Sequence, residues 1–269
     1  MVAGRTEQAK YHQVDLLDPD AVTAAVEEAD CTHLCHMGWV GAETPDRYGT
    51  TENQRWVDAT KHLFNQFSAV GGARIVHVGS CIEYGNDIDG AQHEDSPLQS
   101  NTTYGQAKAD VSRFVLNGVG ETSAAVARVF FCYGRYEQPE RLVPSIITSL
   151  LAGEPIDLTE GRQRRDYIDA RDVAQALIEL LNSDADGAFN VGSGTSVEVR
   201  RVAEILGEGM GRSDLLRFGA RPEGADTAAE ILADTDRIRS LVGWEPTIGL
   251  EDGLQDTLEW WRNAALVQR

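Results

Sequence analysis

The sequence predicts an α/β fold in which parallel strands alternate with helices, and three stretches carry this prediction. Arg74–Ser80 is a β-branched run that ends in small residues, which is typical of a buried strand. The segment from His12 to Met37 has the pattern strand, helix, strand. Tyr104–Lys108 places a tyrosine and a lysine four residues apart, on one face of a helix. Open parallel sheets bind ligands at the carboxyl ends of their strands, so we expect a site beside Ser80.

The composition predicts a soluble protein of one large domain or two small ones. The chain has 269 residues, of which 42% are hydrophobic, and no apolar run approaches the roughly 18 residues of a membrane span. Residues 1–7 lack the apolar core of a signal peptide. The four cysteines form no Cys-x-x-Cys pair. We therefore expect buried free thiols in a reducing cytoplasm, and no metal site.

The charge excludes two classes of partner. The formal net charge is −19, with only three lysines against 21 arginines. Such a surface argues against binding to nucleic acid or to an anionic membrane. Acidic, lysine-poor surfaces keep proteins soluble at high salt, where salt screens their self-repulsion. We expect a halophilic source, the alternative being an ordinary acidic surface encoded by a GC-rich genome.

The first elements lie before Arg74. We expect a strand over His12–Leu17 and a second strand over Thr32–Met37, with a helix from Ala21 to Glu28 between them, capped by Asp18. A longer helix is expected over Tyr48–Ser68. Further along, the pattern predicts a strand over Ala124–Phe131, a helix over Val197–Leu206 and an amphipathic helix over Leu250–Arg262.

Tyr104, Lys108 and Ser80 suggest acid/base chemistry. A free phenol has a pKa near 10 and is a poor proton donor or acceptor at neutral pH. A neighbouring ammonium group favours the phenolate and so makes a tyrosine usable in catalysis. The Ser80 hydroxyl could hold the substrate oxygen at the same point. The alternative is a surface helix that carries a tyrosine and a lysine by chance.

These residues resemble the catalytic serine and the Tyr-x-x-x-Lys pair of the extended short-chain dehydrogenase/reductases, in the nucleotide-sugar epimerase/dehydratase branch. The resemblance covers about residues 10–262. It implies a Rossmann-like parallel sheet with a smaller C-terminal α/β substrate domain. The cofactor domain would comprise residues 1–134 and 162–192, and the substrate domain residues 135–161 and 193–269.

The resemblance also implies a cofactor, NAD or NADP, and a nucleotide-diphosphate sugar as the substrate. By position, the cofactor would be contacted by Asp15, Leu16, Met37, Gly38, Trp39, Tyr104 and Lys108. Arg165 and Arg221 would grip the diphosphate, and Ser80 would orient the sugar. Phe131 stands where the family has an asparagine that reaches the sugar. The sugar must therefore be held differently or be a different sugar.

The family's glycine-rich loop, which binds the cofactor pyrophosphate, has no counterpart before Val14. Gly207–Gly211 follows a helix and indicates a helix C-terminus instead. We expect either a start codon further upstream or a shortened paralogue, and weak or no NAD(P) binding by residues 1–269. We also expect a contracted sheet, in which His12–Leu17 pairs in parallel with Thr32–Met37.

The function implied is that of an NAD(P)-dependent nucleotide-sugar epimerase or 4-ketoreductase. The family's dehydratases often have a threonine at the serine position and add an Asp-Glu pair beside it, whereas this chain has Ser80 followed by Cys81 and Ile82. The alternatives are a non-catalytic nucleotide-sugar-binding paralogue, or a fragment without a function of its own. The resemblance further implies a homodimer, formed through the helix over Tyr48–Ser68 and the helix that carries Tyr104.

Overall fold

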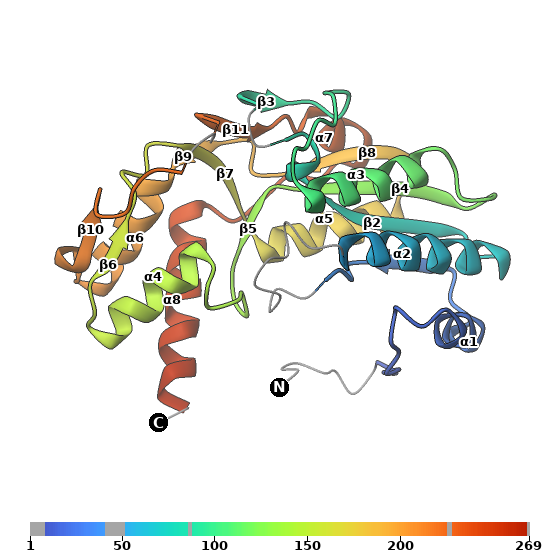
Figure 1. Ribbon diagram of the computed structural model, residues 1–269, viewed down its shortest axis with the longest axis horizontal. Helices are drawn as coiled ribbons and strands as arrows, with labels where there is room; N and C mark the ends of the chain where they lie inside the picture. Colours follow the sequence, from blue (N-terminus) through green and yellow to red (C-terminus); the bar gives the residue numbers. More distant parts are fainter. Residues whose placement is uncertain (1–8, 41–51, 86–87, 225–227, 268–269) are drawn as a thin grey trace.

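The computed structural model describes residues 9–40, 52–85, 88–224 and 228–267 (Figure 1). Its central feature is a parallel four-stranded sheet with the strand order β1-β2-β4-β8. The strands are β1 (His33–His36), β2 (Arg74–Ser80), β4 (Ser123–Val129) and β8 (Gly187–Val191). This parallel α/β architecture confirms the predicted fold class.

Helices cover both faces of this sheet, which explains why apolar side chains occur on both faces of its strands. The helices on one face are α2 (Glu52–Ala69) and α3 (Thr103–Leu116), with α1 (Pro19–Ala29) beside α2, and α5 (Ala170–Asn182) covers the other face (Figure 1). Ile75 packs towards α2 and α3, whereas the next residue, Val76, packs towards α5. Successive β2 side chains thus enter opposite halves of the core.

A second group of strands and helices lies beside the main sheet (Figure 1). The strands β3 (Gly90–Gln92), β11 (Glu230–Ala233), β7 (Arg164–Asp169) and β5 (Phe131–Tyr133) are parallel neighbours in that order, and β9 (Ser196–Glu198) pairs antiparallel with β7. A separate pair is β6 (Ile156–Leu158) with β10 (Leu216–Phe218). The helices α4 (Leu142–Ala152), α6 (Val199–Met210) and α8 (Leu250–Val267) share one apolar core, and α7 (Asp236–Val242) lies beside β8 (Figure 1).

The prediction of a strand over His12–Leu17 is wrong, and so is the contracted sheet. No strand is formed there, and within the described residues β1 pairs only with β2. Val14 and Leu16 nevertheless pack against the core cluster beneath α2. The Asp15 carboxylate accepts a hydrogen bond from the Leu17 amide at 2.9 Å, which turns the chain towards α1. Val14 and Leu16 therefore hold this segment against the core without any strand pairing.

The strand predicted over Ala124–Phe131 is divided in two. β4 ends at Val129, and Phe130 is buried where the chain leaves the main sheet. The Cys132 amide donates to the Phe130 carbonyl at 2.8 Å, and β5 then pairs with β7. Phe131 consequently belongs to the second sheet, where it faces Tyr167.

The cysteines are free, although burial varies among them. Cys81 is buried, whereas Cys31 is exposed just after α1, so the expectation of burial is wrong for Cys31. Within the described ranges, no three His, Cys, Asp or Glu side chains are placed to hold a metal ion. None of the helices in those ranges is both long and apolar enough to cross a membrane.

Candidate active site

Ser80 is the last residue of β2 and caps the 3-10 turn that follows it, Cys81–Glu83. The Ser80 Oγ accepts a hydrogen bond from the Ile82 amide at 3.3 Å. The Glu83 carboxylate accepts one from the Ser80 amide at 2.9 Å, which completes a capping box. Since its oxygen faces a main-chain donor, the Ser80 hydroxyl hydrogen can be donated to a ligand.

Tyr104 and Lys108 lie in the first two turns of α3, as predicted. The helix begins after Thr102, whose Oγ1 accepts a hydrogen bond from the Gly105 amide at 3.1 Å. Gly105 packs closely on the turn after Ser80, since a Cβ there would lie 2.7 Å from the Ile82 carbonyl oxygen. This close approach fixes the start of α3 beside the end of β2.

Lys108 is buried, and its ammonium group donates to the Val78 carbonyl at 2.6 Å. Burial lowers the pKa of Lys108 to about 8, and the negative charge of Glu83 opposes this effect. Two further buried groups, His36 and His77, face one another with their Nδ1 atoms 3.1 Å apart. Burial lowers the pKa of each imidazole, that of His36 to about 3, so the pair is neutral at physiological pH.

Trp39 covers the tyrosine and the lysine. Its indole ring lies 4.3 Å from the Lys108 Nζ, measured to the ring centroid, and meets the Tyr104 ring edge-to-face at 6.5 Å. The indole Nε1 donates to the Asn53 Oδ1 at 2.9 Å. Asn53 is fully buried. Sequence reasoning assigned it no role, although a polar residue on the apolar face of a helix was a usable signal.

The remaining predicted cofactor residues divide into two groups. Leu16 and Gly38 lie together near Trp39: a Cβ on Gly38 would approach the Leu16 Cδ1 to 2.9 Å and Trp56 to 3.7 Å. By contrast, Asp15 is exposed, with its carboxylate engaged in its own turn, and the Met37 side chain is 68% exposed. Leu16, Gly38 and Trp39 thus gather with Tyr104 and Lys108, whereas Asp15 and Met37 lie on the surface.

Trp39→Ala should raise the pKa of Lys108. The indole keeps water from the ammonium, and burial is the largest cause of its lowered pKa. Admitting water should move the midpoint upwards from about 8, by roughly one pH unit. Titration of the lysine side chains by NMR measures this directly, because the chain has only three lysines. Trp260→Phe is the control, and an unchanged midpoint in folded Trp39→Ala protein would contradict the prediction.

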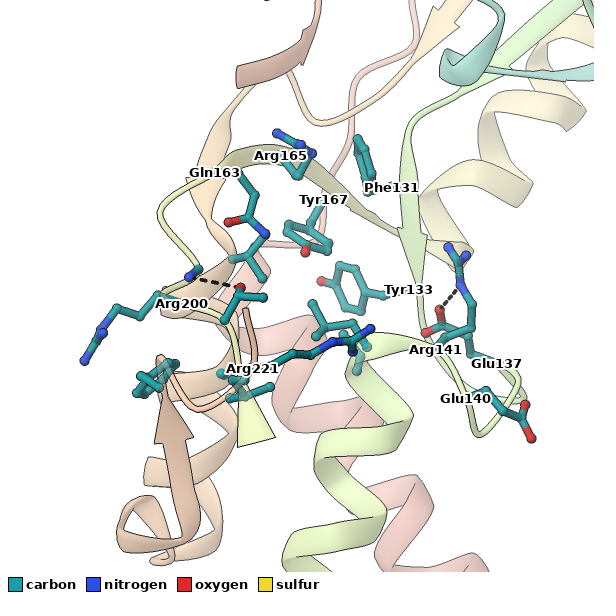
Figure 2. A pocket seen from close by; sticks show the side chains of 18 of the residues that line it. Phe131, Tyr133, Glu137, Glu140, Arg141, Gln163, Arg165, Tyr167, Arg200 and Arg221 are labelled. Atoms are coloured by element: carbon teal, nitrogen blue, oxygen red, sulfur yellow. Dashed lines mark hydrogen bonds and ion pairs between the residues drawn. The ribbon is translucent and has the colours of Figure 1, made fainter. Parts of the chain in front are cut away.

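The predicted substrate residues Phe131, Arg165 and Arg221 line one cavity of about 400 Å³ (Figure 2). The Arg165 guanidinium lies 5.6 Å from the Phe131 ring centroid and donates to the Ala228 carbonyl at 2.9 Å. Arg221 is exposed, and Figure 2 shows its side chain reaching along the cavity wall from the β10 side. Phe131 packs against the cluster that contains Cys81, so the cavity adjoins the turn after Ser80.

Other residues of this cavity were not predicted. Arg200 lies on the Phe218 ring, 3.9 Å from its centroid. Glu137 and Arg141 form an ion pair at 3.3 Å (Figure 2), and burial raises the pKa of Glu137. These residues follow β5 or lie near β6 and β10, where the sequence offered no recognisable motif. The part of the cavity formed by Arg200, Glu137 and Arg141 could therefore be identified only from the structure.

Most of the chain matches one known protein family. Residues 2–192 match the model of the NAD dependent epimerase/dehydratase family. A dTDP-glucose 4,6-dehydratase of Streptomyces niveus is 30% identical over 71% of the chain, and a UDP-glucose 4-epimerase of Bacillus subtilis is 26% identical over 93%. The chain spans 57% of the first relative's length and 81% of the second's.

A solved structure shares the fold. MoeE5, in complex with UDP-glucuronic acid and NAD, superposes with a TM-score of 0.79 at 24% identity. The match covers 92% of this chain and 84% of MoeE5. The Rossmann-like architecture expected from the sequence is thereby confirmed.

Proposed function

Because the chain belongs to the NAD-dependent epimerase/dehydratase family, we propose that it acts on a nucleotide-diphosphate sugar, as an epimerase or a 4-ketoreductase. The observation that carries this proposal is one juxtaposition. Tyr104, buried Lys108 and Trp39 lie beside the end of β2, and the arginine-lined cavity adjoins the turn after Ser80.

The residues present fit a nicotinamide cofactor. Trp39 joins the Lys108 ammonium and the Tyr104 ring at the end of the sheet, and Gly38 packs directly on Leu16, where a Cβ would lie only 2.9 Å from the Leu16 Cδ1. Gly38, Trp39 and Leu16 would hold the cofactor, with Asp15 and Met37 at its outer side and Lys108 at its ribose. When bound, a nicotinamide supplies the acceptor or donor for the hydride. The NAD in the MoeE5 complex favours NAD over NADP.

The chain's own residues would move the proton. Tyr104 would take the proton from a sugar hydroxyl during oxidation and return it during reduction. Lys108 would stabilise the phenolate through its charge. Ser80 would donate its hydroxyl hydrogen to the same sugar oxygen, since its own oxygen already accepts from the Ile82 amide.

The residues beside Ser80 favour an epimerase or a 4-ketoreductase over a dehydratase. Loss of water from the sugar requires an additional acid and base. Burial raises the pKa of the Cys81 thiol to about 12, and Ile82 has no ionisable group. Neither side chain can exchange a proton at neutral pH.

The proposal is tested by incubating the protein with NAD and either UDP-glucose or dTDP-glucose, the sugars named in the two relatives. We expect a 4-epimer or a 4-keto sugar, identified by NMR of the product. Binding of the nucleotide sugar without any conversion would instead support a non-catalytic binding protein. Formation of a 4-keto-6-deoxy sugar would overturn the preference against a dehydratase.

Arg221→Gln should weaken the binding of the nucleotide sugar about 10- to 100-fold, because a charge-assisted hydrogen bond contributes about 1.5–3 kcal/mol. Calorimetric titration with UDP-glucose and dTDP-glucose measures the affinity. Arg217→Gln is the matched control, since Arg217 is also exposed, lies on β10 just before Arg221 in the chain and pairs with Asp157 at 3.7 Å. An equal loss in both variants would indicate a general charge effect and contradict the assignment.

We also expect a homodimer formed through the outer faces of α2 and α3. These helices lie side by side on one face of the sheet (Figure 1), and Leu116 at the end of α3 is 41% exposed. Light scattering at micromolar concentration and high salt should give twice the monomer mass. A monomer mass under those conditions would refute this expectation.

A further inference from the structure

Glu83 is a fully buried carboxylate directly beneath Ser80. Its Oε1 accepts a hydrogen bond from the Ser80 amide at 2.9 Å, and its Oε2 accepts one from the Arg128 Nε at 3.1 Å. Both oxygens are therefore held. A buried charge is tolerated only when it is paired and hydrogen-bonded in this way.

Arg128 is fixed in turn by the polar network around it. Its Nη1 donates to the Tyr84 hydroxyl at 2.9 Å and to the Glu94 carbonyl at 2.8 Å. The Tyr84 hydroxyl then donates to the Asn190 Oδ1 at 2.7 Å. Glu83 is thus part of a rigid network that extends from β2 to β8, and its carboxylate cannot readily turn away from Ser80.

Glu83 also lies close to Lys108. The carboxylate binds the main chain of β2 at Ser80, and the ammonium binds it at Val78. These residues are two apart on the strand, which is roughly 7 Å. The two opposite charges are therefore anchored at neighbouring points of one strand end, where charges still interact strongly because little water intervenes.

Three further titratable side chains lie around Lys108 within the part of the chain that the structure describes. They are His36 on β1, His77 on β2 and Tyr104 on α3. The two imidazoles are neutral, and their positive charge, if present, would disfavour the ammonium. Within the described residues, Glu83 is the only acid whose charge raises the pKa of Lys108.

We propose that Glu83 is a positioning residue of the reaction, whose carboxylate fixes the main chain of Ser80 and keeps the Lys108 ammonium charged. This inference rests on the proposed function, in which Ser80 orients the sugar oxygen and Lys108 stabilises the Tyr104 phenolate. In this role Glu83 acts through Ser80 and Lys108 and does not touch the substrate.

The test is Glu83→Gln, which keeps an oxygen acceptor for the Ser80 amide and removes the charge. The protein is labelled with carbon-13 in its three lysines, and the Lys108 midpoint is titrated by NMR without cofactor or substrate. We expect the midpoint to fall by about one pH unit or more. Glu94→Gln is the matched control: the Glu94 carboxylate also accepts a partly buried hydrogen bond, from the Asn190 amide at 2.8 Å. The Lys108 midpoint in this variant should match that of the unaltered protein.

If Glu83→Gln fails to fold because Arg128 loses its partner, the double variant Glu83→Gln with Arg128→Met removes the pair together. It should show a fall in the same direction, because the Glu83 charge that raises the pKa of Lys108 is removed in this variant too. An unmoved midpoint in either folded variant overturns the proposal.

Turnover supplies the second readout. In the active protein, the alkaline limb of the kcat profile should move to lower pH in Glu83→Gln by the same amount as the NMR midpoint, with KM little changed. An unmoved alkaline limb would overturn the role in catalysis. Failure of the proposed function would look different, because the unaltered protein itself would then convert no nucleotide sugar.

Discussion

Tyr104→Phe should lower kcat at least 100-fold while leaving the affinity for the nucleotide sugar unchanged. The substitution removes only the phenolic oxygen, and positioned acid/base groups typically contribute 10²- to 10⁴-fold to the rate. The aromatic ring that meets Trp39 edge-to-face is retained, so the packing around Lys108 should survive. Steady-state kinetics gives kcat, and calorimetry gives the affinity.

Tyr136→Phe is the matched control, since Tyr136 is 62% exposed and lies against Trp260, far along the chain from α3. It should retain full activity and the same melting temperature. A Tyr104→Phe protein with more than about a tenth of the original kcat would remove Tyr104 from the chemistry. A fall in affinity equal to the fall in kcat would instead assign it to binding.

The elements predicted correctly from the sequence are those whose signals are local. β2 places apolar side chains on both faces because helices cover both, and Ile75, Val76 and Val78 are β-branched. Tyr104 and Lys108 share a helix face through their spacing alone, and Asp18 caps α1 with its own side chain. Such features need no knowledge of which distant segment lies alongside.

The incorrect predictions concern which strands pair with one another. The prediction over His12–Leu17 was a strand, whereas Val14 and Leu16 are partly buried against the core without one, because burial of side chains does not require a hydrogen-bonded neighbour strand. Similarly, the apolar run through Phe131 did not reveal the change of sheet at Phe130, because Val129 and Phe131 both pack against apolar clusters, one on each side of the break.

The polar residues that support the candidate site were missed for a related reason. Asn53 and Glu83 are fully buried and hold Trp39 and Ser80 by hydrogen bonds. In the sequence, each is an ordinary polar residue beside apolar ones. The place of Asn53 on the apolar face of a helix was a usable signal, but its partner Trp39 and the burial of Glu83 follow only from the fold.

Asp166 illustrates how strongly such a residue can matter for stability. Its carboxylate on β7 is completely buried and accepts four hydrogen bonds. The donors are the Ser193 amide at 2.7 Å, the Ser193 hydroxyl at 2.6 Å, the Gly194 amide at 3.0 Å and the Ala233 amide at 3.1 Å. One side chain thus joins β7 to the turn after β8 and to β11.

Asp166→Ala should lower the free energy of unfolding by about 3–5 kcal/mol, because it leaves main-chain donors buried without an acceptor. In a chain of this size, we expect the melting temperature to fall by roughly 10 °C. Calorimetry and urea unfolding measure both quantities. Asp157→Ala is the control, since that side chain is 59% exposed and should change stability by less than about 0.5 kcal/mol. A loss below about 1 kcal/mol for Asp166→Ala would mean that water or a neighbouring group satisfies the orphaned donors, and that this junction is not held by the carboxylate.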